Sequence, residues 1–184
     1  MIYLFTVGMS LSGKSWLVAK IEKSFPNRFV VVDTRNIHDM LNKMGPFIDD
    51  NSPSGPSYDL RERFTKEIRI LLIKLFAKNN IEIIQDSCNL EKKARQERVL
   101  AIKEILPSVK TILIFVNTDK GTIKSRAIEE DRKENNTIWQ DLYNKQLKRF
   151  EIPSKNEADY YIEYNGKDWK PVIKEISKIL DNKV

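Results

Sequence analysis

The feature that most constrains this chain is a glycine-bracketed segment near its start, Gly8-Met-Ser-Leu-Ser-Gly13-Lys14-Ser15. It fits the pattern G-x-x-x-x-G-K-[ST] and stands between a short apolar run and a stretch with the apolar spacing of a helix. Glycines let the backbone curl so that successive N–H groups face one anion, and the helix N-terminus adds its positive end. The segment therefore predicts a strand, a phosphate-binding loop and a helix, in that order.

The chemistry of this loop predicts its ligands. Lys14 is expected to bridge the β- and γ-phosphate oxygens of ATP, and the hydroxyl of Ser15 to ligate Mg²⁺. The residues expected to surround the nucleotide are Gly8, Ser10, Ser12, Gly13, Lys14 and Ser15. The alternative is a plain glycine turn followed by a serine in the first turn of a helix.

Strand-like and helix-like stretches alternate along the rest of the chain. Short apolar runs with β-branched and aromatic residues predict five strands, and some are apolar at nearly every position, as parallel strands covered on both faces are. The five are Ile2–Val7, Phe29–Val32, Ile81–Gln85, Thr111–Val116 and Tyr160–Tyr164. This pattern predicts an α/β fold, a three-layer sandwich around a five-stranded parallel sheet, with residues 1–184 as one domain.

The segments between the strands carry three further predictions. Thr137-Ile-Trp-Gln140 is expected to open a helix as a capping box. Gly45–Ser57 has three prolines and two glycines, which predicts an exposed, mobile loop at the acceptor entrance. Apolar residues at helical spacing are expected to bury one face of the helix before the third strand: Leu60, Phe64, Ile68, Leu71, Leu72, Leu75 and Phe76.

Composition limits the chemistry. The chain carries 32 Lys and Arg against 26 Asp and Glu, and the formal charge of +6 permits a phosphate-rich or nucleic-acid partner. Cys88 and His38 are the only residues of their types, which excludes an internal disulfide, a Cys-rich zinc site and a metal site built from several histidines. With no apolar stretch of membrane-spanning length and no signal-peptide pattern, the expected setting is cytoplasmic.

Motifs that accompany other phosphate loops are missing from the sequence. It has neither the D-x-x-G nor the N-K-x-D segment that GTPases use. The predicted third strand is followed by Asp86-Ser87, without the glutamate that water-activating ATPases place there. The phosphoryl acceptor is therefore expected to be another molecule rather than water, and the fold to be of the P-loop kinase type.

Asp33 is the candidate general base. It ends the second predicted strand, and in doubly wound sheets ligands lie at the carboxyl ends of the strands, beside the phosphate loop. A carboxylate there can accept the proton of an attacking hydroxyl. Asp33 can equally cap the helix that follows it, and the sequence leaves that alternative open. Arg35, two residues further on, is expected to face either an acceptor phosphate or solvent.

Taken together, these residues resemble the kinase domain of phage-type polynucleotide 5′-kinases. The segment Asp86-Ser-Cys-Asn89-Leu90 is similar to the D-T-N-L-N segment of that family, with one residue more, and Asp33 stands where the family has its general base. The resemblance extends to about Tyr164. It implies that Asp86 and Asn89 contribute to binding the acceptor.

The same resemblance implies a lid at about residues 126–137 with two arginines, of which at least one contacts the transferring phosphate; Arg126 and Arg132 are the two candidates. In an open lid both arginines are expected to rest on the acidic run Glu129–Asp131. Two features depart from the family. The two arginines are more widely spaced than the family's pair, and Asn36 stands where the family has an arginine for a 3′-phosphate.

Three hypotheses about function remain. The first, favoured by the resemblance, is an ATP-dependent kinase that phosphorylates the 5′-hydroxyl end of single-stranded DNA or RNA. The second is a kinase for a small molecule such as a nucleoside or nucleotide, and the third is a nucleotide-gated adaptor related to tRNA-modification factors. Five basic residues on the helix after Asn89 agree with a polyanionic acceptor: Lys92, Lys93, Arg95, Arg98 and Lys103.

Overall fold

The computed structural model describes residues 1–44 and 56–181, and for residues 56–59 it describes the backbone alone. The strands in these ranges form one parallel sheet in the order β2-β3-β1-β4-β5. Their bounds are β1 (Ile2–Val7), β2 (Val30–Asp33), β3 (Ile83–Asp86), β4 (Lys110–Val116) and β5 (Tyr160–Tyr164). The predicted bounds of β1 and β5 are confirmed, and β4 begins one residue earlier than predicted. Strands β2 and β3 begin one and two residues later than predicted, and each ends one residue later, at an aspartate.

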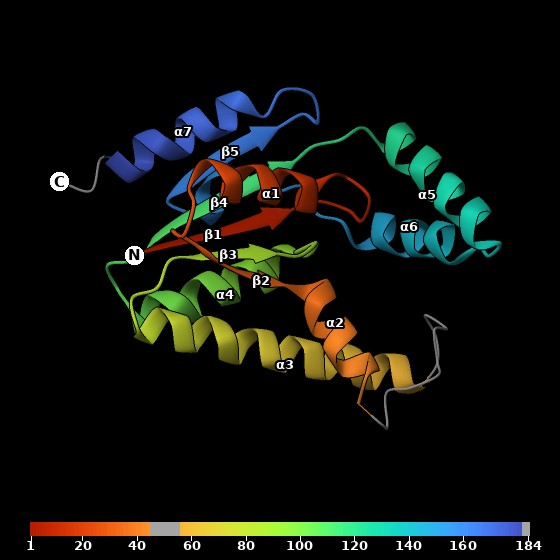
Figure 1. The fold of residues 1–184 in the computed structure, drawn as a ribbon, viewed down its shortest axis with the longest axis horizontal. Coiled ribbons are helices and arrows are strands. Elements are labelled where there is room, and N and C mark those ends of the chain that lie inside the picture. Colours follow the sequence, from red (N-terminus) through yellow and green to blue (C-terminus); the bar gives the residue numbers. More distant parts are fainter. Residues whose placement is uncertain (45–55, 182–184) are drawn as a thin grey trace.

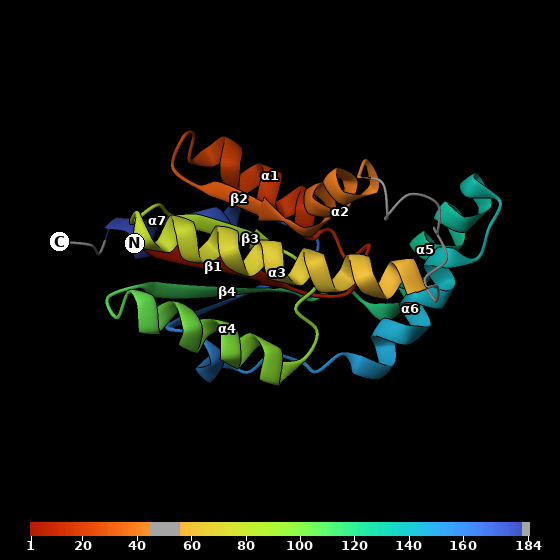
Figure 2. The ribbon, with the colours of Figure 1, turned by 90° about the horizontal axis from the view of Figure 1, so that it is seen from below.

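Helices cover both faces of the sheet, so the predicted three-layer α/β fold is confirmed (Figures 1 and 2). Helices α1 and α7 lie on one face, and α2, α3 and α4 lie on the other. Helices α5 and α6 stand beyond the carboxyl ends of the strands (Figure 1). The bounds are α1 (Lys14–Ser24), α2 (Thr34–Asn42), α3 (Pro56–Lys78), α4 (Lys92–Ile105), α5 (Lys120–Glu134), α6 (Ile138–Arg149), α7 (Lys170–Asp181) and the 3₁₀ turn η2 (Lys155–Glu157).

Strand β1 shows why the sheet needs both layers. Every one of its residues is buried. Ile2 and Leu4 pack with Leu17 and other residues of α1 and α7. Tyr3 and Phe5 point to the opposite face, where they meet the helices α2, α3 and α4. Because side chains alternate along a strand, a run that is apolar at almost every position can only be buried between two layers.

The predicted buried face of α3 is partly wrong. Leu71 and Leu75 are 65% and 55% exposed, whereas Arg69 and Ile73 are buried. Helix α3 packs against α2 and α4, and this contact turns the line of residues through 69 and 73 toward the sheet. A residue two positions further along a helix is rotated by about 200°, so 71 and 75 face solvent.

Two other predictions concern segment ends. Helix α3 begins at Pro56, so the last two residues of the predicted loop Gly45–Ser57 are helical. The remainder of that loop, residues 45–55, lies outside the described residues, and its mobility and its place at the acceptor entrance remain predictions.

Among the helices of the described ranges, none combines the length and apolar character needed to cross a membrane.

The capping box predicted at the start of α6 is absent. Thr137 precedes the helix, but its side chain makes no capping hydrogen bond. The carboxylate of Asp131 caps α6 instead, because it accepts hydrogen bonds from the backbone N–H groups of Trp139 at 2.7 Å and Gln140 at 3.0 Å. Burial alone would raise the pKa of Asp131, but these bonds and one from the Gln140 side chain hold it below its ordinary value.

Candidate active site

The phosphate loop connects β1 to α1 and has the backbone that its glycines predict. Gly8 has a φ of +155°, and a Cβ at this residue would lie 2.9 Å from the carbonyl oxygen of Val116. Leu11 and Gly13 also have positive φ angles, 62° and 98°. The N–H of Gly8 donates to the carbonyl oxygen of Cys88 at 3.0 Å. The loop is therefore tightly wound and tied to the segment that follows β3.

Two polar side chains of this loop fit a bound phosphate. The ammonium group of Lys14 is almost buried and donates to the carbonyl oxygen of Met9 at 2.7 Å, so it folds back over the loop. The hydroxyl of Ser12 is buried and has no hydrogen-bond partner among the described residues. A phosphate in the loop would give both groups an anionic oxygen. Ser15 is exposed in the first turn of α1, a position that suits a Mg²⁺ ligand.

Asp33 and Asp86 end the neighbouring strands β2 and β3 and stand opposite each other in register. The Asp33 carboxylate accepts a hydrogen bond from the Arg35 N–H at 2.8 Å and caps α2. Burial raises the pKa of Asp33, the Arg35 N–H bond opposes this, and the negative charge of Asp86 raises it further. The capping alternative is thus confirmed. Asp33 has a second carboxylate oxygen besides the one that caps the helix, and its raised pKa suits a general base. The side chain of Arg35 is exposed.

The predicted acceptor residues Asp86 and Asn89 are both buried, and their side chains engage the protein itself. An oxygen of Asp86 accepts a hydrogen bond from the Thr6 hydroxyl at 3.3 Å. The Asn89 amide donates to the carbonyl oxygen of Thr6 at 2.7 Å and accepts from the Gln85 amide at 3.2 Å. Since β3 lies beside β1, Asp86 stands next to the phosphate loop, where a carboxylate can help to hold Mg²⁺. Contact of Asp86 or Asn89 with an acceptor remains a prediction.

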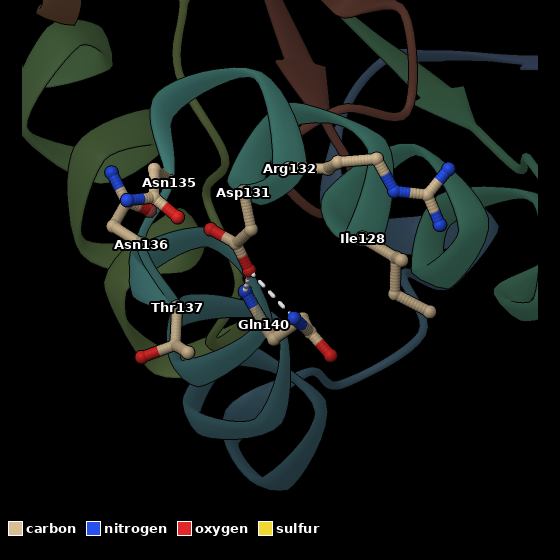
Figure 3. A pocket seen from close by; sticks show the side chains of 7 residues that line it. All are labelled: Ile128, Asp131, Arg132, Asn135, Asn136, Thr137 and Gln140. Carbon is tan, nitrogen blue, oxygen red and sulfur yellow. Dashed lines mark hydrogen bonds between the residues drawn. The ribbon is translucent and has the colours of Figure 1, made fainter.

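The structure separates the two arginines of the predicted lid. The guanidinium of Arg126 reaches the phosphate loop and donates to the carbonyl oxygen of Leu11 at 2.8 Å. Arg132, further along α5, makes no hydrogen bond or ion pair within the described ranges. Figure 3 shows its side chain pointing away from the Asp131 carboxylate, in a hollow between α5 and α6.

The prediction that these arginines rest on the acidic run Glu129–Asp131 is wrong. Lys133 pairs with both glutamates of that run, at 3.3 and 2.8 Å. The aspartate of the run is occupied as the cap of α6. The acidic residues therefore have nearer partners, one turn away on the same helix or at the start of the next.

Gln146 is a site residue that the sequence patterns did not indicate. It lies on α6, is 8% exposed, and its side-chain oxygen accepts a hydrogen bond from the N–H of Ser10 at 2.7 Å. Its amide nitrogen donates to the Ser10 hydroxyl at 2.8 Å. Gln146 therefore joins α6 to the phosphate loop. A single glutamine in a polar helix carries no pattern from which this contact could be predicted.

The basic residues of α4 do not form the single exposed patch that the sequence suggested. Arg95 is fully buried and pairs with Glu157 at 2.6 Å. Lys103 pairs with Asp159 at 2.6 Å. Arg98 is turned toward the sheet, and one of its terminal nitrogens is buried. Arg95 and Arg98 are three positions apart, so both lie on the inner face of the helix.

Comparisons with known proteins agree with this geometry at the level of the fold. No protein-family model matches the chain, and no curated protein matches it in sequence. An inferred kinase of Chloroflexus aurantiacus superposes with a TM-score of 0.80 and 11% identity, over 100% of this chain and 97% of the other. The fold is that of the P-loop kinases.

Two further kinases are similar in structure over almost the whole chain. A gluconokinase of Sinorhizobium meliloti has a TM-score of 0.58 and 13% identity, covering 98% of this chain and 94% of the other. A shikimate kinase of Aquifex aeolicus has a TM-score of 0.52 and 16% identity, covering 98% and 96%. These likenesses concern the P-loop kinase fold, and they lend no support to the resemblance to polynucleotide 5′-kinases in particular.

Proposed function

We propose that this protein is an ATP-dependent kinase that phosphorylates a hydroxyl group of a small molecule. The observation that carries the proposal is the arrangement of the phosphate loop, with Lys14 folded over it, on the same edge of the sheet as Asp33, whose pKa is raised. One group suits the donor phosphates and the other suits the acceptor hydroxyl. The proposed domain comprises the whole chain, with residues 126–137, the end of α5 and the turn before α6, as the lid.

The proposed reaction is an in-line transfer. The oxygen of the acceptor hydroxyl forms a bond to the γ-phosphorus, the bond from that phosphorus to the β,γ-bridging oxygen breaks, and ADP leaves with the electron pair. The hydroxyl proton passes to Asp33. Lys14 stabilises the charge on the phosphates, with Arg126 and Arg132 approaching from α5. Mg²⁺, held by Ser15 and near Asp86, would neutralise the phosphate oxygens.

A small-molecule acceptor is better supported than a polynucleotide end. The similar solved structures include a gluconokinase and a shikimate kinase, and each name states a small-molecule substrate. The predicted basic patch on α4, which favoured a polyanion, is dispersed by the buried ion pair of Arg95 and the inward turn of Arg98. The polynucleotide 5′-kinase and the nucleotide-gated adaptor are kept as the competing outcomes of the test.

The test is ADP release from ATP and Mg²⁺ in the presence of separate acceptors. The panel contains sugars, hydroxy acids, nucleosides, nucleoside monophosphates and a single-stranded oligonucleotide with a 5′-hydroxyl. We expect acceptor-dependent turnover with a small molecule. Turnover with the oligonucleotide alone would establish the polynucleotide kinase. Slow hydrolysis that no acceptor accelerates would favour the adaptor.

Two substitutions separate the proposed roles. Asp33→Asn keeps an oxygen that can cap α2 and is expected to lower kcat by roughly a hundredfold or more, with ATP affinity unchanged. Lys14→Ala is expected to lower kcat by roughly a hundredfold and to weaken ATP binding as well. Asp39→Asn, the same change at an exposed carboxylate of α2, is the matched control. If Asp33→Asn retained more than about a tenth of the wild-type kcat, the proposed base would be wrong.

A further inference from the structure

Two arginines on neighbouring helices point into the protein on the α3 and α4 side of the sheet. Arg69 belongs to α3 and is 8% exposed, and Arg98 belongs to α4 and is partly buried. The two helices pack against each other (Figure 2). Within the described ranges, neither arginine forms an ion pair with a carboxylate. The Nε of Arg69 and one Nη of Arg98 are buried, and neither has a hydrogen-bond partner there.

The position of Arg69 connects this pair to the proposed acceptor site. Its guanidinium donates to the hydroxyl of Thr34 at 3.2 Å. Thr34 directly follows Asp33, and its own hydroxyl donates to the carbonyl oxygen of Asp86 at 3.3 Å. Arg69 therefore reaches the first turn of α2, one residue from the proposed general base.

The groups around the two arginines do not neutralise them. Burial, and after it the positive charge of Arg98, lower the pKa of Arg69 to about 10. Burial likewise lowers the pKa of Arg98. The phenol of Tyr3, which both arginines influence, stays protonated because burial raises its pKa to about 12.

Two glutamates interact with this pair at longer range. Glu62 influences Arg69, but its carboxylate is bonded to His38 at 2.9 Å, and Glu97, next to Arg98 on α4, is exposed. Both guanidinium groups carry a positive charge, lie on helices that pack against each other, and have no bonded anion among the described residues. Like charges in a buried setting are unfavourable, so such a pair is suited to a site that an anion completes.

We propose that Arg69 and Arg98 bind an oxyanion, either a carboxylate or a phosphate, carried by the acceptor whose hydroxyl faces Asp33. This assignment deepens the proposed kinase function and rests on it. The planar fork of a guanidinium matches two oxygens of such a group, and the unpartnered nitrogens of the pair supply the donors. With its anion held by α3 and α4, the acceptor is oriented so that its hydroxyl lies between Asp33 and the phosphate loop.

The first experiment measures anion binding without turnover. Wild-type protein is saturated with Mg²⁺ and the non-hydrolysable ATP analogue AMP-PNP, which occupies the phosphate loop, and is titrated with inorganic phosphate by calorimetry. We expect saturable binding that Arg69→Met and Arg98→Met each weaken by roughly tenfold or more. Arg63→Met, which removes an exposed arginine of the same helix, is the matched control and is expected to change binding by less than about twofold.

The second experiment uses the acceptor found in the kinase assay and distinguishes the two sources of the oxyanion. Hydroxy acids and phosphorylated hydroxyl compounds are compared as substrates. For the class that is the true acceptor, Arg69→Met is expected to raise KM by about tenfold or more while the KM for ATP changes little. Inorganic phosphate is expected to compete with that acceptor and not with ATP.

The outcomes separate this assignment from the kinase function. If phosphate binding depends on both arginines but no acceptor is phosphorylated, the anion site stands and the kinase function fails. If an acceptor is phosphorylated but phosphate binding and acceptor KM are unchanged in both variants, the anion site is overturned. Should a methionine variant not fold, Arg69→Lys keeps the charge but loses the fork. We then expect weakened phosphate binding, and wild-type binding by this variant overturns the assignment.

Discussion

Arg95 and Glu157 form an ion pair whose two side chains are fully buried between α4 and the turn η2. The guanidinium donates to both carboxylate oxygens, at 2.6 and 3.1 Å, and also to the carbonyl oxygens of Asn89, Leu90 and Glu151. We predict that Arg95→Met lowers the free energy of unfolding by about 3–5 kcal/mol, because it leaves a buried carboxylate without its cation. For 184 residues this corresponds to a fall in Tm of roughly 10 °C.

The effect has a defined dependence on pH. Burial alone would raise the pKa of Glu157, but the hydrogen bonds from Arg95 and Ser154 and the charge of Arg95 hold it below its ordinary value. A carboxyl group of this kind contributes stability above its unfolded pKa and loses that contribution as the pH falls through its folded pKa. The difference between wild type and Arg95→Met is therefore expected to be full at pH 7 and to shrink below about pH 4.

Urea denaturation followed by circular dichroism measures these differences. The control is Arg149→Met, which breaks an exposed pair with Glu91 at 2.8 Å and is expected to lose less than about 1 kcal/mol. Adding Glu157→Leu to Arg95→Met is expected to recover most of the loss, because the stranded carboxylate is then gone. The reasoning is refuted if Arg95→Met loses no more than the control, or if the second substitution destabilises the protein further.

Four other predictions follow from the site. The kcat/KM of the wild type is expected to fall at acid pH with a midpoint above the ordinary aspartate pKa of about 3.9, because burial and the charge of Asp86 raise the pKa of Asp33. A pH–rate profile with a midpoint at or below that value contradicts this prediction. Gly8→Ala brings a Cβ within 2.9 Å of the Val116 carbonyl oxygen, so calorimetry is expected to show ATP affinity lowered by about tenfold. Gln146→Leu is expected to speed amide hydrogen exchange in the phosphate loop, and unchanged exchange would deny the contact a role. Arg69→Met is expected to raise the Tm of the free protein in phosphate-free buffer above that of Arg63→Met, whereas a fall would mean that Arg69 supports the fold.

The parts of the fold that the sequence predicted correctly are those that depend on short-range patterns. Strand β1 has the expected bounds because a continuous apolar run has few other ways to be buried. Strand β5 matches as well, because its aromatic and β-branched residues favour a strand. The phosphate loop follows from its glycines, of which Gly8 has no room for a side chain. The order of the strands in the sheet could not be predicted, because packing between distant segments sets it. For the arrangement as a whole, the sequence predicted only the fold class.

Helix α6 shows how a local motif loses to a distant partner. Thr137 and Gln140 have the spacing of a capping box, yet the backbone N–H groups at the start of α6 are bonded to Asp131, which belongs to the previous helix. A carboxylate is a stronger acceptor than a hydroxyl, and the hairpin of α5 and α6 brings it to the helix N-terminus. The sequence contains the aspartate but not the turn that aligns the two helices.

Helix α3 carries the most consequential difference between pattern and structure. Apolar periodicity considers only apolar residues, so it placed Leu71 in the core and gave no reason to bury Arg69. The structure has the reverse. Burying a guanidinium without a carboxylate is unfavourable for the fold alone, which is why the pattern fails at this position. Residues that disobey the rules of a core are expected where the protein binds something, since the missing partner then arrives with the ligand. By that argument, the burial of Arg69 in place of Leu71 is itself the reason to look for the acceptor's charged group beside it.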